Sequence, residues 1–525
     1  MKITPVRFGF KNMSNINKSS IGFIICFIFI LVVFPSCNKE EAPIPETNDL
    51  KVKLESITLD PVYPRAERNS TLYVKMSNTG TDYQAGKVEL ILPSGVTMVA
   101  NSAPQQSFTS WKANETKTLK FYIQAKSAEP QEIEIKALVG SSAYSTTTIQ
   151  SWNPAVKEPS GATPSPQVVS TGKYLIGAQR CDLWRNDGVW GLYKDNKFPD
   201  RQPVIGWYKE GESDVTDWEI KYALEHGISY FMHCWYRKQG NAGQPLITEY
   251  DHVMKSYKTC KFGNQMKFML NWVNSENRGI SGLDDLMNNI FPEFLKYFKE
   301  SNYVKIDNKP VLGIYGPTSF ITELGGEANA LKAIQALNQK CIDAGFAGIM
   351  VWGQFCWGSS TSVNQPLKNA GMEYIYSYHV PTFGQVMSGS SDTYTASEII
   401  VGHKTYWKNQ AQYASLPNIL TVSMGWNSAP WGYMTSKKNW RLTPAEYKSV
   451  LQEAKNAMDA YPQDKIHSKM LLLDNWNEYG EGHYIFPTRQ YAFGYLDAIR
   501  SVFATSPVAH TDYIPEDFGQ NLNNW

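Results

Sequence analysis

The sequence lacks an excess of charge of either sign. Its 525 residues include 50 Lys and Arg against 49 Asp and Glu, which leaves a formal net charge of +1. No run of five basic residues occurs, so neither the whole chain nor a local patch offers a field that attracts a polyanion. The composition therefore excludes nucleic acid as the partner and is consistent with a neutral one.

Cysteine is scarce as well, with 7 residues and no CxxC pair. Beyond Cys26 and Cys37, the remaining cysteines are odd in number and widely spaced: Cys181, Cys234, Cys260, Cys341 and Cys356. This spacing is typical neither of a disulfide framework nor of a zinc site. We expect small buried thiols. The sequence also has no H-E-x-x-H, G-x-S-x-G or P-loop motif, and we expect neither a metal nor a cofactor.

Long hydrophobic runs are missing too. The most apolar stretch, Ile21 to Phe34, has 14 residues and stops at Pro35, whereas a membrane span needs about 20. Four basic residues and no acidic one precede it, as in a secretory signal peptide: Lys2, Arg7, Lys11 and Lys18.

The segment ending at Cys37 resembles a relaxed bacterial lipobox, in which the cysteine is lipidated and becomes the new N-terminus. Asn38 to Glu41 resembles the acidic export tag of Bacteroidetes surface lipoproteins. We therefore predict a lipoprotein signal peptide at residues 1–37, lipidation at Cys37, and an outer-membrane anchor that faces the cell surface or the periplasm. The alternative is an ordinary signal peptide with an incidental cysteine.

Two globular parts follow. After a linker at 38–50, residues 51–155 carry short segments of alternating polarity separated by turn signals, which predicts a small antiparallel β-sandwich, Ig-like in form. This part contains no acid pair, metal cluster or glycine loop. We interpret it as a spacer or packing domain, with a carbohydrate-binding module as the alternative.

A linker rich in Pro, Ser and Gly at 156–170 precedes a second part, 171–510. Here apolar runs alternate with amphipathic stretches, and eight such runs indicate a (β/α)₈ barrel, a TIM barrel. The expected strands are 174–179, 228–235, 267–272, 310–315, 348–354, 374–379, 419–425 and 469–475. The expected amphipathic helices are 216–225, 283–298, 328–344, 444–460 and 490–502. A doubly wound open sheet is the alternative, but no glycine-rich fingerprint follows the first strand.

What the sequence has in abundance is aromatic residues: 16 Trp, 30 Tyr and 23 Phe make up 13% of the chain. In a (β/α)₈ barrel the site lies at the carboxyl ends of the strands. There, nearly every predicted strand ends in a ring and a hydrogen-bonding side chain, a mixture typical of a carbohydrate site. The predicted substrate-binding residues are His233, Trp235, Tyr236, Asn271, Trp272, Tyr315, Trp352, Gln354, His379, Trp426, Asn427, Trp476, Asn477, Tyr479 and His483.

Two carboxylates stand at the end of the eighth predicted strand. Glu478 and Glu481 are three residues apart, between glycines that permit a sharp turn. Glycoside cleavage uses two carboxyl groups with opposed tasks, one protonated and one ionised. Because the segment follows an apolar strand and carries several rings, a solvated helix face is a poor interpretation. We predict that both residues are catalytic.

The stretch Asn475 to Gly482 resembles the Asn-Glu-aromatic-x-Glu-Gly signature of glycoside hydrolase family 99, the endo-α-mannosidases, and of WbsX-like domains. Three further blocks, 230–236, 270–277 and 309–315, resemble WbsX-like sequences. The resemblance covers about 174–503 and implies a retaining α-glycosidase. In the mannosidases the first Glu deprotonates the sugar 2-hydroxyl and the second is the acid/base. By motif position, Glu478 becomes the base and Glu481 the acid/base.

The motif departs from the mannosidase pattern immediately after the second acid. His483 to Pro487 replaces the polar residues of that family, so a mannose-containing glycan is only one candidate substrate. WbsX-like proteins have also been named glycosyltransferases. We predict a glycosidase acting on an α-linked oligosaccharide or polysaccharide. The alternatives are a glycan-binding lipoprotein without turnover and a transferase. We expect His233 and His379, on different strands without a nearby acid, to be sugar hydrogen-bonders or satisfied core residues rather than metal ligands.

Overall fold

The computed structural model describes residues 50–156, 161–185, 187–194, 197–355, 361–380, 394–432, 439–506 and 509–523. The signal peptide, Cys37, Cys356 and most of the first linker lie outside these residues. Within the part of the chain that is described, no helix combines the length and the hydropathy of a membrane span.

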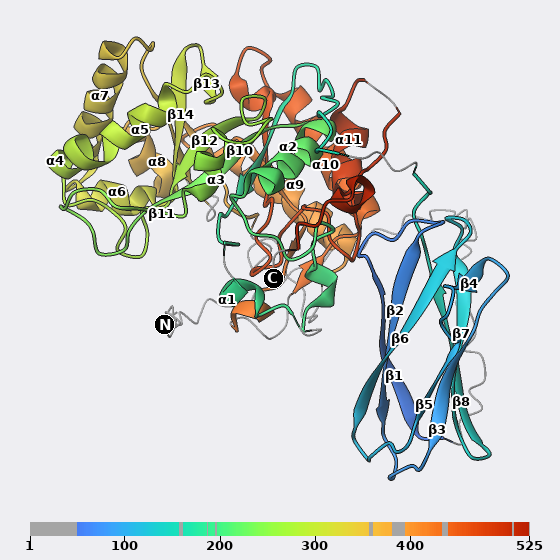
Figure 1. Ribbon diagram of the computed structural model, residues 1–525. Coiled ribbons are helices and arrows are strands. Elements are labelled where there is room, and N and C mark those ends of the chain that lie inside the picture. Colours follow the sequence, from blue (N-terminus) through green and yellow to red (C-terminus); the bar gives the residue numbers. More distant parts are fainter. Residues whose placement is uncertain are drawn as a thin grey trace, which may run out of the picture. The chain divides into compact units, whose positions relative to one another are not determined.

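Residues 52–150 form two antiparallel sheets that face each other (Figure 1). One sheet has the order β1-β2-β6-β4 and the other β5-β3-β7-β8. The strands are β1 (Val52–Asp60), β2 (Asn69–Asn78), β3 (Gly86–Ile91), β4 (Val96–Met98), β5 (Gln105–Phe108), β6 (Thr116–Ala125), β7 (Gln131–Val139) and β8 (Ser142–Gln150).

Alternation explains this part of the fold. Along β2, buried Leu72, Val74 and Met76 alternate with residues that are partly exposed, as expected for a sheet with one face on a core. The same pattern recurs in β6. The buried faces meet in one apolar core that includes Trp111 and Phe121. The predicted sandwich is therefore present.

The second part is a parallel barrel with eight main strands in the order β16-β15-β14-β12-β10-β9-β20-β17. In chain order they are β9 (Leu175–Arg180), β10 (Ile228–Arg237), β12 (Lys267–Trp272), β14 (Lys309–Ile314), β15 (Met350–Gln354), β16 (Tyr374–Tyr376), β17 (Leu420–Ser423) and β20 (Met470–Asp474). Most of their residues are buried, as continuous apolar runs predict. The predicted (β/α)₈ fold is confirmed.

The barrel closes between β16 and β17. Ile375 bridges Asn418, and the amide of Ile419 donates to the carbonyl of Ile375 at 2.8 Å. Beyond this point a side chain continues the contact between the two strands, since the hydroxyl of Thr421 donates to the carbonyl of Ser377 at 2.9 Å. The ring of strands is thereby complete, and its carboxyl ends surround a common centre.

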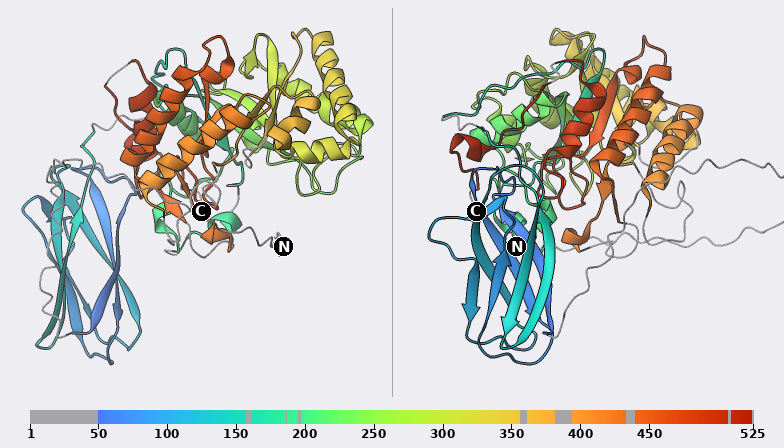
Figure 2. Two further views of the ribbon diagram at one scale, coloured as in Figure 1. Left: turned by 180° about the vertical axis from the view of Figure 1, so that it is seen from behind. Right: turned by 90° about the vertical axis from the view of Figure 1, so that its right-hand side faces the viewer.

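Helices cover the outside of the barrel. The longer ones, of ten residues or more, are α2 (Ser213–Glu225), α7 (Glu327–Asp343), α9 (Ala396–Tyr413), α10 (Pro444–Ala460) and α11 (Gly494–Phe503). Shorter ones are α1 (Asp187–Trp190), α3 (His252–Ser256), α4 (Leu283–Asp285), α5 (Phe291–Phe298), α6 (Pro317–Glu323) and α8 (Thr361–Asn369). The two views of Figure 2 show α9, α10 and α11 side by side. Further short strands are β11 (Thr248–Glu249), β13 (Lys305–Ile306), β18 (Gly425–Trp426) and β19 (Trp440–Arg441).

Candidate active site

The segment after β20 turns back over the barrel, and two glycines allow it. Gly482 has a φ of 76°, and a Cβ there would lie 2.7 Å from the backbone of Asn427. At Gly480 a Cβ would lie 1.8 Å from the indole nitrogen of Trp431. The close approach brings the amide of Asn427 to 2.6 Å from the carbonyl of Glu481. Both predicted catalytic acids are held in this turn.

Glu478 is buried, with 4% of its surface exposed. Its Oε1 has no hydrogen-bond partner among the described residues. Burial, and secondarily the charge of Glu481, raises the pKa of Glu478 to about 7. The carboxyl group therefore titrates near neutrality, as a general base or acid must.

Three tyrosines from separate strand ends stand near Glu478, beside an apolar patch of Cys181, Cys234 and Val273: Tyr236, Tyr315 and Tyr378. Burial raises the pKa of Tyr236 and of Tyr378 well above the ordinary value, and the charge of Glu478 adds to this. All three tyrosines are partly exposed. They offer neutral hydroxyl groups and ring edges around the acid.

Glu481 is paired with a histidine. Its Oε2 lies 2.9 Å from Nε2 of His483, whose Nδ1 lies 3.6 Å from Asp474 Oδ2. Burial lowers the pKa of His483, but the two carboxylates outweigh it and raise the pKa to about 10. At neutral pH an imidazolium therefore stands between Asp474 and Glu481, and its Nε2 donates to Glu481.

Asp474 also joins His379 to the site. Nδ1 of His379 donates to Asp474 Oδ2 at 2.5 Å, and the Ser423 hydroxyl donates to the same oxygen at 2.6 Å. Burial lowers the pKa of His379, which keeps it neutral. The Trp426 ring stacks on His483 at 5.1 Å between centroids and lies 4.7 Å from His379. The structure thus brings together three predicted residues, His379, Trp426 and His483, around an acid.

Several aromatic rings that were predicted to bind substrate do not face this site. Trp235 and Trp272 point outward and pack on Phe294 of α5, while the Trp476 indole donates to Glu219 at 3.2 Å. These three and Trp352 are fully buried. The prediction that these rings offer open faces to a ligand is corrected. Neighbouring residues of a strand point to opposite faces of the sheet. The prediction took every residue at each strand end, so it included side chains that point outward as well as inward.

Burial removes two other predicted residues. His233 faces Asp182 at 2.8 Å through Nδ1 and the Tyr257 hydroxyl at 2.8 Å through Nε2, so both ring nitrogens are already engaged. Tyr479 is fully buried, with its hydroxyl 3.4 Å from that of Tyr208. Both are structural here. The premise that His233 and His379 lack a nearby acid was also wrong, since Asp182 and Asp474 contact them.

The predicted polar residues also divide into buried and partly exposed ones. Asn477 is buried, and its Nδ2 donates to Glu210 Oε1 at 2.7 Å while its Oδ1 accepts from the amide of Cys181. Asn271 lies inside the barrel and accepts from the Tyr376 hydroxyl at 2.6 Å. Gln354 and Asn427 are partly exposed. We retain these last two, with the three tyrosines' exposed edges and Trp426, as surfaces for a ligand.

A buried charge cluster behind the turn was not foreseen. Arg180 donates from Nε to Asp182 at 2.7 Å and from Nη2 to Glu210 at 2.7 Å, and it also contacts Glu219. All four side chains are fully buried. Because Asn477 and Trp476 bond to Glu210 and Glu219, this cluster, which we call the Arg180 cluster, holds the turn that carries Glu478. The four residues are spread over 40 positions of the sequence and form no local motif, so the sequence alone did not predict this cluster.

His379, Asp474 and His483 offer metal-ligand atoms close together. Ligands at zinc bond lengths of about 2.0–2.1 Å stand roughly 3.3 Å apart in a tetrahedron. The 2.5 Å between His379 Nδ1 and Asp474 Oδ2 is shorter and fits a hydrogen bond. We therefore interpret this group as a hydrogen-bonded network.

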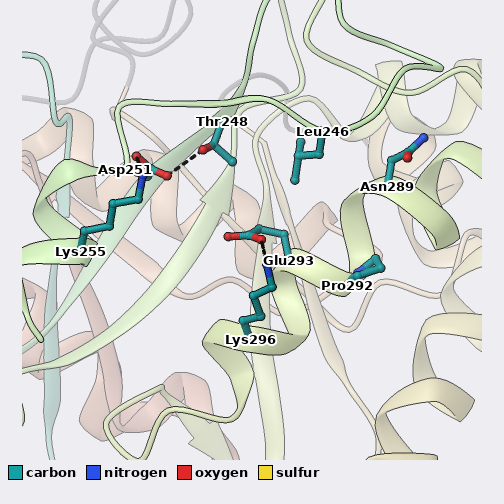
Figure 3. A pocket seen from close by; sticks show the side chains of 8 residues that line it. All are labelled: Leu246, Thr248, Asp251, Lys255, Asn289, Pro292, Glu293 and Lys296. Atoms are coloured by element: carbon teal, nitrogen blue, oxygen red, sulfur yellow. Dashed lines mark hydrogen bonds and ion pairs between the residues drawn. The ribbon is translucent and has the colours of Figure 1, made fainter.

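A surface hollow of about 310 Å³ lies elsewhere, beside α3 and α5 (Figure 3). None of the residues described above lines it. Its charged groups pair with one another, Asp251 with Lys255 at 2.9 Å and Glu293 with Lys296 at 2.6 Å. The lining residues are Leu246, Thr248, Asp251, Lys255, Asn289, Pro292, Glu293 and Lys296. Nothing in this hollow matches the chemistry at Glu478.

Comparison with known families places the chain. The family described as "Glycosyltransferase WbsX" matches residues 189–499, more than half of the sequence. The chain belongs to the WbsX family. A search of curated proteins found no match.

Distant likenesses to solved structures accompany this assignment. A protein titled "Glycoside hydrolase-like protein" is 16% identical, with a TM-score of 0.46, and the match covers 66% of this chain and 98% of that one. The GH99 endo-α-mannosidase of Bacteroides thetaiotaomicron is 14% identical, with a TM-score of 0.42, covering 62% of this chain and 95% of that one.

Proposed function

We propose that this WbsX-family protein is a retaining glycosidase that cleaves an α-linked glycan with Glu478 and Glu481. The observation that carries the proposal is the pair itself. A buried carboxyl with a pKa near 7 stands beside a second carboxylate that is hydrogen-bonded to an imidazolium, at the carboxyl end of a (β/α)₈ barrel.

Motif position assigns the base to Glu478 and the acid/base to Glu481. A raised pKa makes Glu478 a stronger base than an exposed carboxylate, which suits removal of a proton from a sugar 2-hydroxyl. The freed oxygen then attacks C1, and the C1–O bond to the leaving group breaks. Glu481 receives a proton from the imidazolium of His483 along their hydrogen bond and passes it to the leaving oxygen, which leaves His483 neutral and Glu481 ionised.

Water completes the reaction. Glu481 takes a proton from a water molecule and returns it to His483. The oxygen of that water adds to C1 and opens the 1,2-anhydro ring, while Glu478 gives its proton back to O2. Two displacements at C1 give net retention of configuration. Tyr236, Tyr378 and Trp426 stand where the sugar and its hydroxyls would lie.

The test compares wild type, Glu478→Gln and Glu481→Gln on a panel of α-linked oligosaccharides, with mannose-containing ones included. Each variant is expected to lose about 10²–10⁴-fold in kcat, and the product anomer is read by NMR. Glu453→Gln, the same change at a partly exposed glutamate on the outer helix α10, is the matched control and keeps most activity. Binding without turnover by wild type would favour the non-catalytic alternative, and turnover surviving both Gln variants would exclude the pair.

The pH profile separates the two possible role assignments. With Glu478 as base, kcat/KM rises with pH through about 7, because the ionised form is the active one. A fall through the same pH would instead make Glu478 the acid. Measuring the profile with an aryl glycoside, whose leaving group needs little protonation, isolates this limb.

The family description supports one other candidate, a glycosyltransferase. A transferase would form product only with a nucleotide-sugar or lipid-sugar donor, and no phosphate cradle is evident in the sequence. Donor-dependent product in the same assay would replace the hydrolase proposal. We further propose that Cys37 anchors the protein to the outer membrane, with a Cys37→Ala chain in the soluble fraction as the expected result.

A further inference from the structure

A second histidine–carboxylate group lies away from Glu478. His226 follows the last turn of α2 and precedes β10, so it stands near the amino ends of the barrel strands. His510 and Asp512 come from the chain segment after α11, and Asp497 comes from the first turn of α11. The His226 cluster, as we call these four residues, thus joins the C-terminal segment to two helices of the barrel.

A hydrogen bond from Nδ1 fixes the orientation of the His226 ring. Its Nδ1 lies 2.7 Å from the carbonyl oxygen of Tyr222 and donates to it. The ring is fully buried, and its Nε2 has no hydrogen-bond partner of suitable geometry among the described residues. That nitrogen faces Asp512 Oδ1 at 3.2 Å and Asp497 Oδ1 at 3.6 Å. A nitrogen that faces two carboxylate oxygens carries a cation, which is either its own proton or a metal ion in place of that proton.

The distances fit a metal ion as that cation. His510 Nε2 lies 2.9 Å from Asp512 Oδ1, so three contacts of 2.9, 3.2 and 3.6 Å relate the four groups. Ligands around a tetrahedral zinc stand about 3.3 Å apart, given bonds of about 2.0–2.1 Å. A histidine that donates its other nitrogen to a backbone carbonyl is also the usual arrangement of a metal ligand.

We propose that His226, His510 and Asp512 bind a divalent transition metal of the zinc class, with Asp497 beside the fourth position. The ion clamps the C-terminal segment to α2. Arg500 supports the same junction, since it donates to the carbonyls of Glu225 and Ala509. The site is structural and independent of the proposed glycosidase activity.

The experiment uses the full chain, stripped with a chelator and then dialysed against zinc chloride. Metal analysis is expected to give one zinc per chain, and zinc is expected to raise the thermal unfolding midpoint. His510→Gln and Asp512→Asn each lower zinc affinity by more than about 10–100-fold. His379→Gln, at the other histidine–acid group, is the matched control and keeps the zinc.

A spectroscopic measurement keeps the proposal testable if a variant unfolds. Cobalt bound to the wild-type protein gives the intense visible absorption of a tetrahedral site, and added zinc bleaches it. A wild-type chain that retains no zinc and shows no such band overturns the proposal. So does zinc binding that survives in both His510→Gln and Asp512→Asn, or that His379→Gln abolishes.

Discussion

The β-sandwich and the barrel bury different kinds of side chain. Between residues 50 and 156 none of the buried side chains is a carboxylate, and the core is apolar. The barrel instead buries many carboxylates, among them Asp182, Glu210, Glu219, Asp474 and Glu478. Burying a charge costs free energy unless it is paired. The sandwich core avoids this cost, whereas the barrel has to pair its buried acids with cations and hydrogen-bond donors.

The largest expected effect on stability concerns the Arg180 cluster of the barrel. Arg180→Leu leaves three buried carboxylates without their cation, and we expect a loss of about 3–5 kcal/mol in the free energy of unfolding. Urea unfolding at pH 7 measures it. Arg180→Lys keeps the charge but not the forked geometry and should lose less. A leucine variant as stable as wild type would show that the cluster has no such role.

Glu478 offers a test of intermediate size. Its folded pKa, about 7, lies above the ordinary 4.5, so its proton stabilises the folded state at low pH, and this stabilisation is lost as pH rises through 7. Glu478→Gln has no proton to lose. Relative to wild type, we expect the variant to gain about 1–3 kcal/mol between pH 5 and 8, measured by urea unfolding. A difference independent of pH would contradict the assigned shift.

The sandwich should respond without any pH dependence. Ile123→Val removes one methylene from its fully buried core and is expected to cost about 0.5–1.5 kcal/mol at pH 5 and at pH 8 alike. Turnover at a temperature below unfolding should not change. Thermal unfolding and kcat, followed on the same sample, check both statements, and a lower kcat would link the sandwich to the site.

The smallest effect is expected at the sandwich surface. Lys87 and Glu89 form an ion pair of 2.6 Å with both side chains partly exposed. Such pairs contribute little, so Lys87→Ala should change stability by less than about 0.5 kcal/mol. A loss above 1 kcal/mol in urea unfolding would mean that charge matters to the sandwich as it does to the barrel.

Much of the fold could be read from hydrophobic patterning. All eight predicted barrel runs contain the observed strands or overlap them closely, and α10 spans Pro444–Ala460 as expected. Helix α9 was missed, although Thr395 and Glu398 form a capping box at its start. Its polar and apolar residues follow a helical period only weakly, so the cap was the one local signal available.

The candidate site was predicted unevenly. The two acids could be found because they share one turn with two glycines, and the sequence keeps them three residues apart. Rings such as Trp235 and Trp272 were misassigned, because the face to which a strand residue points depends on the register of the strand with its neighbours. The Arg180 cluster and the His226 cluster draw on residues up to 286 positions apart, counted from His226 to Asp512.

The sequence by itself determined the alternation of the sandwich, the buried strands of the barrel and the Glu478–Glu481 motif, because each is a local pattern of a few residues. Only the tertiary structure decided which rings face inward, which histidines meet acids and how far burial moves a pKa. Those properties arise when the barrel closes and brings distant strands around one centre, where water is excluded and each charge depends on its neighbours.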